Sequence, residues 1–288
     1  MTSQRVIILG HTGFVGKALF NFLKSDDKDI HGFSSSTLDL RRFDSLSCLD
    51  PLIHNKTTLI FTSALTPDKG ATLDVLKTNL DMSMNLAKYL EKHPVEQCIY
   101  LSTDAVYPLS EKAITETSGI EPSSFNALAK YAGERILNRV SETTGLPLLI
   151  LRLNPVYGFG DTHGSYGPNL FMRSIFQEKR VRLFGDGEDK RDHLYINDAV
   201  RLIAHFVQNK TTGLYNLAMG QSYSFAKIVE ILQRSVPFSF SIEKLPRKVP
   251  LTHRHFDVSN LLRVVPGFRY TPVEEALQDY VSNLTRVL

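Results

Sequence analysis

Three glycines near the N-terminus, spaced three residues apart, constrain the fold of this chain more than any other feature. They follow a β-branched apolar run at residues 6–9, typical of a strand buried on both faces, and precede helical apolar spacing at residues 17–23. Gly10 permits a sharp turn, Gly13 lets a pyrophosphate approach the backbone, and Gly16 lets the helix lie close to the strand. An ordinary glycine-rich turn is the alternative, but the position between strand and helix favours a dinucleotide site at the helix N-terminus. We expect cofactor contacts from Gly10, Thr12, Gly13, Phe14, Val15 and Gly16.

Strands and helices alternate over the first 160 residues. Apolar runs that read as strands lie at residues 30–34, 58–64, 97–107 and 148–153, and helical spacing lies at 73–91 and 124–140. This alternation predicts an α/β fold with a doubly wound parallel Rossmann sheet.

The pattern changes after residue 160. It predicts a helix at 169–177, a strand at 181–184, a strand and helix at 194–207, a last sheet strand at 215–217 and a mostly helical segment at 222–288. We expect a dinucleotide-binding domain at 1–160, completed by about 191–220, and a smaller mixed α/β substrate-binding lobe at 161–190 and 221–288.

The residue that follows the second strand distinguishes NAD from NADP. An acid there would hold the ribose hydroxyls of NAD, but this chain has Ser34, then Ser35 and another serine. Arg41 and Arg42 follow shortly and could attract a 2′-phosphate, although an exposed helix start is the alternative for them. The sequence favours NADP within the NAD(P) class.

Polar side chains end the strand at residues 97–107. Thr103 and Asp104 lie where a doubly wound sheet places its ligands, at the carboxyl end of a parallel strand. Ala64 ends the preceding strand and Asn79 lies on the helix between the two, so we expect both beside the cofactor.

Composition excludes several classes of function. A net charge of +3 over 288 residues is too small and too dispersed to predict nucleic-acid binding. The only two cysteines, Cys48 and Cys98, fit neither a disulfide framework nor a metal site, and they are typical of a reducing cytoplasm. No secretion signal or membrane-spanning apolar run is present in the sequence.

Taken together, these motifs resemble the extended short-chain dehydrogenases/reductases of the NAD(P)-dependent nucleotide-sugar epimerase, dehydratase and reductase type. The resemblance covers nearly the whole chain. The motifs that carry it are the glycine loop, Ser102-Thr103 ahead of Val106-Tyr107, Asn154-Pro155-Val156-Tyr157-Gly158, and Gly185-Asp186-Gly187 followed by Arg191-Asp192-His193-Leu194-Tyr195-Ile196-Asn197-Asp198.

The resemblance implies a nucleotide-diphosphate sugar as ligand. It gives Arg191 a contact with the diphosphate, to which a planar guanidinium is suited, with an internal salt bridge as the alternative. It gives Asn154 a contact with the sugar or its phosphate, and the backbone amides of Asn169 and Leu170 a contact with the diphosphate. Arg247, or the lysine after it, matches the family's second phosphate-binding base. A homodimer that includes the helix at 124–140 is also implied.

The chain departs from the family at the residue that acts as catalytic base. The family has a tyrosine four residues before a lysine, so that both lie on one helix face and the lysine lowers the pKa of the phenol. Lys130 matches that lysine, which also binds the cofactor, but Asn126 stands at the tyrosine position. An amide cannot accept a proton from a sugar hydroxyl at neutral pH. Tyr131 is displaced by five helical positions, about 140° around the axis.

Three hypotheses follow, and the first is preferred to the second. The protein is a modified enzyme in which Thr103 acts with Lys130 or Asp104 as acid and base. Alternatively, it is a cofactor- and nucleotide-sugar-binding protein without turnover, a sensor or regulatory subunit. In the third hypothesis, a local irregularity brings another hydroxyl such as that of Tyr107 into place.

Overall fold

The computed structural model describes residues 4–24, 29–109, 112–162, 164 and 166–287. The chain forms two compact units. Unit 1 comprises residues 1–108, 119–153 and 200–215, and unit 2 comprises residues 109–118, 154–199 and 216–288.

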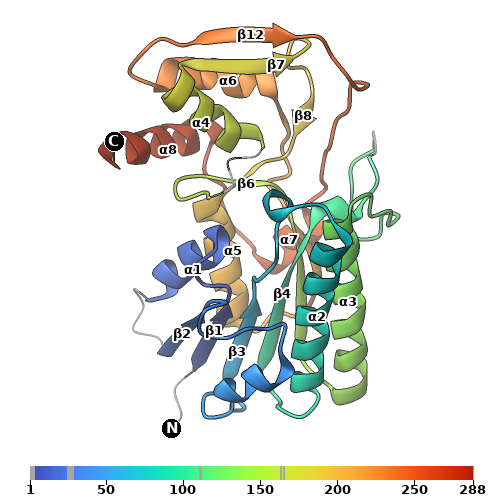
Figure 1. Ribbon diagram of the computed structural model, residues 1–288. Coiled ribbons are helices and arrows are strands. Elements are labelled where there is room, and N and C mark those ends of the chain that lie inside the picture. Colours follow the sequence, from blue (N-terminus) through green and yellow to red (C-terminus); the bar gives the residue numbers. More distant parts are fainter. Residues whose placement is uncertain (1–3, 25–28, 110–111, 163, 165, 288) are drawn as a thin grey trace. The chain divides into compact units, whose positions relative to one another are not determined.

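A six-stranded sheet forms the centre of unit 1, with the strand order β2-β1-β3-β4-β5-β10 (Figure 1). Its strands are β1 (Arg5–Leu9), β2 (Asp29–Phe33), β3 (Thr57–Phe61), β4 (Gln97–Thr103), β5 (Leu148–Leu153) and β10 (Gly213–Leu217). The first five pair in parallel. This confirms the predicted doubly wound parallel sheet.

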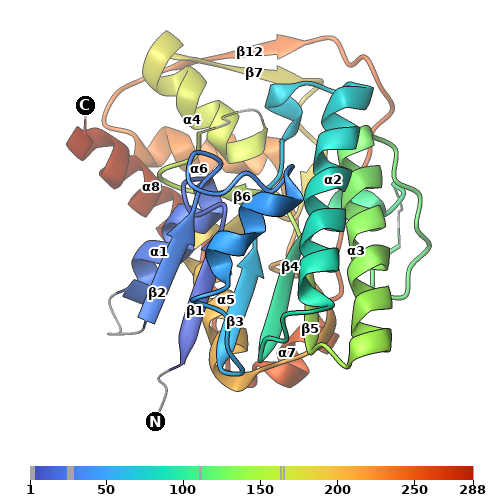
Figure 2. The ribbon, with the colours of Figure 1, turned by 60° about the horizontal axis from the view of Figure 1, so that its bottom comes forward.

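Helices cover both faces of this sheet. They are α1 (Phe14–Lys24), α2 (Leu73–Leu90), α3 (Phe125–Thr144) and α5 (Ile196–Asn209), with short 3₁₀ turns η1 (Phe43–Leu49), η2 (Pro67–Lys69) and η3 (Asp104–Val106). Figure 2 shows α2 and α3 side by side in front of the sheet, and the two pack on each other. From β1 the chain runs outward to β2 and then crosses to β3 on the other side of β1. The carboxyl ends of β1 and β3 therefore form the switch point where such sheets bind ligands.

The apolar runs are strands because both of their faces are covered. Ile7 and Leu9 belong to the core cluster that packs under α2 and α3. Val6 and Ile8, which alternate with them, are also fully buried. Both faces of β1 thus lose their contact with water, as the continuous apolar pattern predicts.

Unit 2 is a mixed α/β assembly of short elements. They are β6 (Val156–Tyr157), α4 (Gly167–Glu178), β7 (Arg180–Phe184), β8 (Lys190–Arg191), β9 (Leu194–Tyr195), β11 (Tyr223–Ser224), α6 (Phe225–Ser235), β12 (Ser241–Leu245), α7 (Ser259–Val264) and α8 (Val273–Val287). β12 pairs in parallel with β7, beside α4 and α6 (Figure 1).

The strand β12 was not expected within the segment predicted to be mostly helical. Its residues show no clean alternation of buried and exposed positions, so periodicity carried no strand signal there. No helix in the described part of the chain is long and apolar enough to cross a membrane.

Candidate functional site

Two of the three loop glycines are required by the packing of unit 1 itself. Gly10 has a left-handed φ of +94°, and a Cβ there would lie 2.7 Å from Thr62 Oγ1. A Cβ on Gly16 would lie 2.2 Å from the carbonyl oxygen of Gly10, so α1 sits directly on the turn.

Gly13 is different, because a Cβ there would lie 3.4 Å from its nearest neighbour, the Gly10 oxygen, and because its φ is not left-handed. The fold alone does not require glycine here. A bare backbone at Gly13 instead leaves room for a ligand to approach the first N–H groups of α1, which have no partner inside the helix. These residues fit the pyrophosphate of a dinucleotide.

The serines after β2 form a small polar turn. Ser34 Oγ and Ser36 Oγ share a hydrogen bond of 2.7 Å, and the Ser34 N–H donates to Thr37 Oγ1. Arg41 is engaged by Asp39 through two hydrogen bonds of 2.8 Å. Of the two arginines expected near a 2′-phosphate, Arg41 therefore already has an anionic partner.

Asn79 fixes the loop that follows β3. Its Nδ2 donates to the Leu65 carbonyl at 3.0 Å, and its Oδ1 accepts from the Leu65 N–H at 2.8 Å. Asn79 is buried, and its amide is used by this reciprocal pair of bonds. It holds the backbone next to Ala64 rather than presenting a free side chain.

The helix α3 brings Lys130 to the end of β4. Lys130 Nζ donates to the Leu101 carbonyl at 2.7 Å and lies 5.0 Å from the ring centroid of Tyr100. Burial lowers the pKa of Lys130 to about 8, against the carboxylate of Glu134, which raises it. A lysine in this state can exchange a proton near neutral pH.

Asn126 lies one turn before Lys130 on a regular helix. Ser124 caps that helix, accepting a hydrogen bond of 3.1 Å from the Ala127 N–H. Among the described residues, Asn126 Oδ1 is buried without a hydrogen-bond partner. Thr103 Oγ1 accepts from the Ala105 N–H at 3.2 Å.

The structure gives no support to the hypothesis that Tyr107 replaces the missing tyrosine. The helix α3 is continuous from Phe125 to Thr144, so there is no local irregularity at Asn126. The Tyr107 hydroxyl is buried and accepts a hydrogen bond of 2.8 Å from Arg152 NH1. The Tyr107 hydroxyl is therefore a hydrogen-bond acceptor for Arg152.

Sequence reasoning missed the buried pair formed by Glu134 and Arg152. Arg152 NH2 lies 2.7 Å from Glu134 Oε2, and the two side chains are 5% and 3% exposed. Two signals could have found it: an arginine inside the apolar run at residues 148–153, and an acid four residues after Lys130 on the buried face of its helix.

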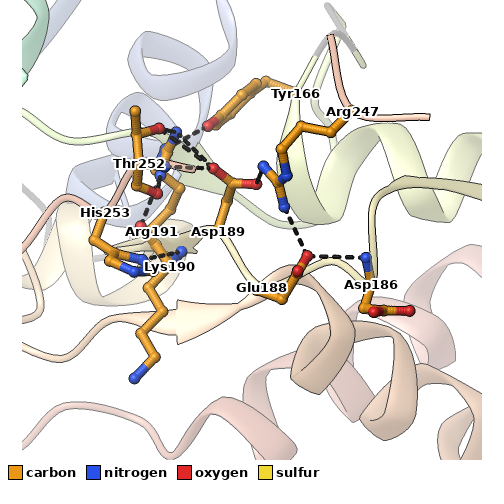
Figure 3. Close-up of polar contacts among 9 residues, drawn as sticks. All are labelled: Tyr166, Asp186, Glu188, Asp189, Lys190, Arg191, Arg247, Thr252 and His253. Atoms are coloured by element: carbon orange, nitrogen blue, oxygen red, sulfur yellow. Dashed lines mark hydrogen bonds and ion pairs between the residues drawn. The ribbon is translucent and has the colours of Figure 1, made fainter. Parts of the chain in front are cut away.

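In unit 2, the guanidinium of Arg191 is bound by neighbouring protein groups (Figure 3). Its Nε donates to the Tyr166 hydroxyl at 2.9 Å, and NH1 donates to the carbonyls of Lys190 and Thr252. NH2 donates to Thr252 Oγ1 at 2.7 Å. The conformation described holds Arg191 in place by internal contacts, and most of its N–H groups are used.

Arg247 has two carboxylate partners. Its NH1 donates to Asp189 Oδ2 at 2.5 Å and its NH2 to Glu188 Oε2 at 2.6 Å. Figure 3 shows the carboxylate of Asp189 pointing between Arg247 and Thr252, whose N–H it also accepts. Burial opposes ionisation, but the hydrogen bonds from Arg247 and Thr252 hold the pKa of Asp189 below its ordinary value. The salt-bridge alternative considered for Arg191 applies to both arginines, because Arg191 NH2 lies 3.9 Å from Asp189 Oδ1 while Arg247 pairs more closely with Asp189 and Glu188.

Asn154 and Asn169 have different surroundings. Asn154 is buried, its Nδ2 donates weakly to the Asp192 carbonyl at 3.4 Å, and its Oδ1 has no partner among the described residues. Asn169 instead uses both ends of its amide to hold the turn at Val156 and Gly158. The side chain of Leu170 is exposed, and its backbone N–H donates to the Tyr166 carbonyl at 3.5 Å.

His193 is a buried residue that sequence reasoning did not single out. It lies among the rings of Tyr157, Tyr166 and Phe225. Burial and the nearby charge of Arg191 lower the pKa of His193 to about 3. Neither ring nitrogen has a hydrogen-bond partner in the described part of the chain.

The two acids of the Arg191–Asp198 motif stabilise unit 2. Asp192 accepts from the N–H groups of Met219 and Gly220 at 2.9 and 2.7 Å. Asp198 accepts from the N–H and the hydroxyl of Thr271. The described residues contain no cluster of three or more His, Cys, Asp or Glu that could hold a metal ion.

Comparison with known proteins adds a family and a fold. A family model described as "NAD dependent epimerase/dehydratase family" matches residues 6–218. The uncharacterized UDP-glucose epimerase YtcB of Bacillus subtilis is 24% identical over 229 residues, which are 69% of this chain and 71% of that protein.

Two solved structures each match 99% of this chain over 100% of their own chain length. RMD from Pseudomonas aeruginosa, complexed with NADPH, has a TM-score of 0.88 and 21% identity. The UDP-glucuronic acid 4-epimerase from Bacillus cereus, in complex with UDP-glucuronic acid and NAD, has a TM-score of 0.81 and 17% identity. At these identities the structural likeness shows the fold alone.

Proposed function

Because this chain belongs to the NAD dependent epimerase/dehydratase family, as its motifs indicated, we propose that unit 1 binds a nicotinamide dinucleotide and that the protein is an enzyme acting on a nucleotide-diphosphate sugar. The reaction is an epimerisation, a dehydration or a reduction by hydride transfer at a sugar carbon. The observation that carries this proposal is the placement of Lys130 at the end of β4, where its amine donates to the Leu101 carbonyl at 2.7 Å. Burial lowers the pKa of this amine to about 8, so it can take and return a proton near neutral pH.

The residues of the proposed cofactor site in unit 1 then have separate roles. The backbone at Gly13 and the start of α1 hold the pyrophosphate. A bound nicotinamide supplies the hydride acceptor and donor. Lys130 orients the nicotinamide ribose and shares the proton transfer with Asp104, while the Thr103 hydroxyl orients the reacting sugar oxygen.

The proposed contacts of the nucleotide sugar come from unit 2. The Oδ1 of Asn154, which has no partner among the residues that the structure describes, can accept a hydrogen bond from a sugar hydroxyl. The backbone amides of Asn169 and Leu170, in the first turn of α4, suit a phosphate oxygen, for which the Leu170 N–H would leave its 3.5 Å contact with the Tyr166 carbonyl. Arg191 and Arg247 supply positive charge, but each must exchange a present partner for the diphosphate.

We also propose a preference for NADP over NAD. Its support is the run of serines that begins at Ser34 and Ser35, where no acid repels a 2′-phosphate, and the exposed Arg42 nearby. Titration of the protein with NADPH and NADH, followed by ligand fluorescence, tests this preference. Tighter binding of NADH would overturn it.

Asn126 favours a second candidate, a protein that binds both ligands without turnover. The amide cannot serve as the base that the family places there. To separate the candidates, the purified protein is incubated with NAD or NADP and a panel of UDP-, GDP-, dTDP- and CDP-sugars. Products are identified by mass spectrometry and by analysis of sugar stereochemistry. Binding by calorimetry without any product across the panel would support the second candidate and contradict the first.

The proposed assembly is a homodimer through α2 and α3. Its support is the exposed apolar side chains of these two helices: Leu73, Met84, Phe125 and Leu128. Analytical ultracentrifugation tests it, since a monomer at micromolar concentration would contradict it.

The free thiols of Cys48 and Cys98 support the proposed cytoplasmic location.

A further inference from the structure

Two residues of α3, one turn apart, are each hydrogen-bonded to the end of β4. Lys130 Nζ donates to the Leu101 carbonyl at 2.7 Å. The hydroxyl of Ser102, the next residue of the strand, donates to Glu134 Oε1 at 2.5 Å. Helix and strand are therefore locked together immediately before Thr103.

Arg152 extends this link to β5 and to the segment after Thr103. Its Nε and NH2 donate to the two oxygens of Glu134 at 3.0 and 2.7 Å, a bidentate arrangement. Its NH1 donates to the Tyr107 hydroxyl, and the guanidinium carbon lies 4.8 Å from the Tyr107 ring centroid. Ser102 and Tyr107 lie on either side of Thr103 in the sequence. The Glu134–Arg152 pair therefore holds both ends of the segment that carries Thr103.

The carboxylate of Glu134 also affects the charge of Lys130. The buried titratable groups on α3 and on the elements packed against it, besides Lys130, are Glu134, Tyr89, Cys98, Tyr100, Asp104, Tyr107 and Arg152. Burial lowers the pKa of Lys130, and Glu134 raises it. Without Glu134, the positive guanidinium of Arg152 would lose its carboxylate partner on the neighbouring helix.

We propose that the buried Glu134–Arg152 ion pair is a positioning device for the cofactor site: it fixes the Lys130 amine relative to Thr103 and keeps that amine charged for its contact with the dinucleotide. This inference rests on the proposed function, because it assumes that the dinucleotide reaches Lys130. Glu134 and Arg152 act through Lys130 and Thr103 rather than on the ligand.

Stability alone does not account for such a pair. Two charges buried at 3% and 5% exposure lose their hydration, and a well-packed apolar pair of similar volume is often as stable or more stable. An apolar replacement therefore separates a positioning role from a structural one.

The test measures NADPH and NADH binding by fluorescence titration between pH 6 and pH 10, with thermal unfolding as the check on folding. The first variant, Glu134→Gln, removes the negative charge. The second, Glu134→Leu combined with Arg152→Met, replaces the whole ion pair by apolar side chains, and it is the folded variant to use if Glu134→Gln does not fold. The control is Glu142→Gln, because Glu142 pairs with Arg139 on the exposed face of the same helix.

In the wild type we expect affinity to fall as pH rises through about 8. In the folded variants the midpoint shifts lower by about one pH unit, which weakens binding about fivefold at pH 8 and about tenfold at pH 9 and above. The control keeps the wild-type midpoint. An unchanged midpoint in the folded double variant overturns the positioning role while leaving the proposed function intact. A wild type that binds neither dinucleotide at any pH overturns the proposed function, and this inference with it.

Discussion

Asn126 and Lys130 lie one helical turn apart on α3. The Asn126 Oδ1 has no hydrogen-bond partner in the described part of the chain, and the Lys130 amine donates to the Leu101 carbonyl at 2.7 Å. The spacing of the family's base and lysine is preserved, while the group that would act as base has been replaced. The dinucleotide-binding geometry and the proton-transfer chemistry of this chain can therefore be tested separately.

Restoring the phenol tests whether the site is otherwise competent. In Asn126→Tyr, the hydroxyl would lie on the Lys130 face, where the ammonium lowers its pKa. We expect turnover of the preferred nucleotide sugar to rise about 10²-fold or more, the usual contribution of a positioned acid–base group. Phe125→Tyr is the matched control, because it adds the same hydroxyl at an adjacent, exposed helix position. Equal activities in the two variants would contradict the assigned position.

The loop glycines should respond differently to alanine. Gly16→Ala places a Cβ 2.2 Å from the Gly10 oxygen, so we expect α1 to shift and the melting temperature to fall. Gly13→Ala meets its nearest atom at 3.4 Å, so the fold should be retained while the dinucleotide loses its close approach. Differential scanning calorimetry and NADPH titration check both. A Gly13→Ala protein with wild-type cofactor affinity would argue against the dinucleotide site.

Lys130 should make stability depend on alkaline pH. Its pKa is about 8 in the folded protein against an ordinary 10.5, so the unfolded chain binds more protons at this residue between those values. The free energy of unfolding therefore gains up to ~3 kcal/mol from this lysine as pH rises from about 8 to 10.5. In Lys130→Met that gain should be absent. Urea unfolding at intervals of pH measures it, and identical slopes in the two proteins would refute the buried, poorly hydrated state of the amine.

His193 should make the protein sensitive to acid. The folded pKa of about 3 lies below the ordinary 6.5, so the contribution of neutral His193 is lost as pH falls from about 6.5 toward 3. His193→Phe keeps a ring among Tyr157, Tyr166 and Phe225 and removes two unpartnered nitrogens. We expect equal or greater stability at pH 7 and a smaller loss at pH 4. Thermal melts across this range check it, with His54→Phe in a half-exposed loop as the control.

The resident anion beside Arg247 should weaken binding of a diphosphate. Asp189→Asn keeps the size of the side chain and its acceptor for the Thr252 N–H, but it removes the charge that Arg247 holds at 2.5 Å. We expect calorimetric affinity for UDP to increase several-fold at low salt, by about 1 kcal/mol. Asp186→Asn is the control, because Asp186 is exposed and pairs with Lys244. If both variants bind UDP alike, Arg247 is not a diphosphate contact.

Local sequence patterns determined the fold of unit 1. The apolar runs at residues 6–9 and 148–153, the alternation of strand and helix, and the glycine loop are all local patterns of a few residues. Their interpretation therefore needs no knowledge of distant partners. The same is true of the spacing between Asn126 and Lys130, which a regular helix converts directly into a shared face. The strand β12 escaped detection because its sequence, Ser-Ile-Glu-Lys-Leu, has no regular alternation of apolar and polar residues.

Tertiary structure decided which polar side chains are already engaged. Asn79 is used by Leu65 and Arg247 by two acids, although the motifs gave both side chains to ligands. Glu134 and Arg152 lie 18 residues apart, and only the packing of α3 on β5 brings their charges together. A hydrogen bond depends on the positions of both partners, and burial sets the pKa of Lys130 and His193. Local sequence specifies neither the position of a hydrogen-bond partner nor the burial of a side chain.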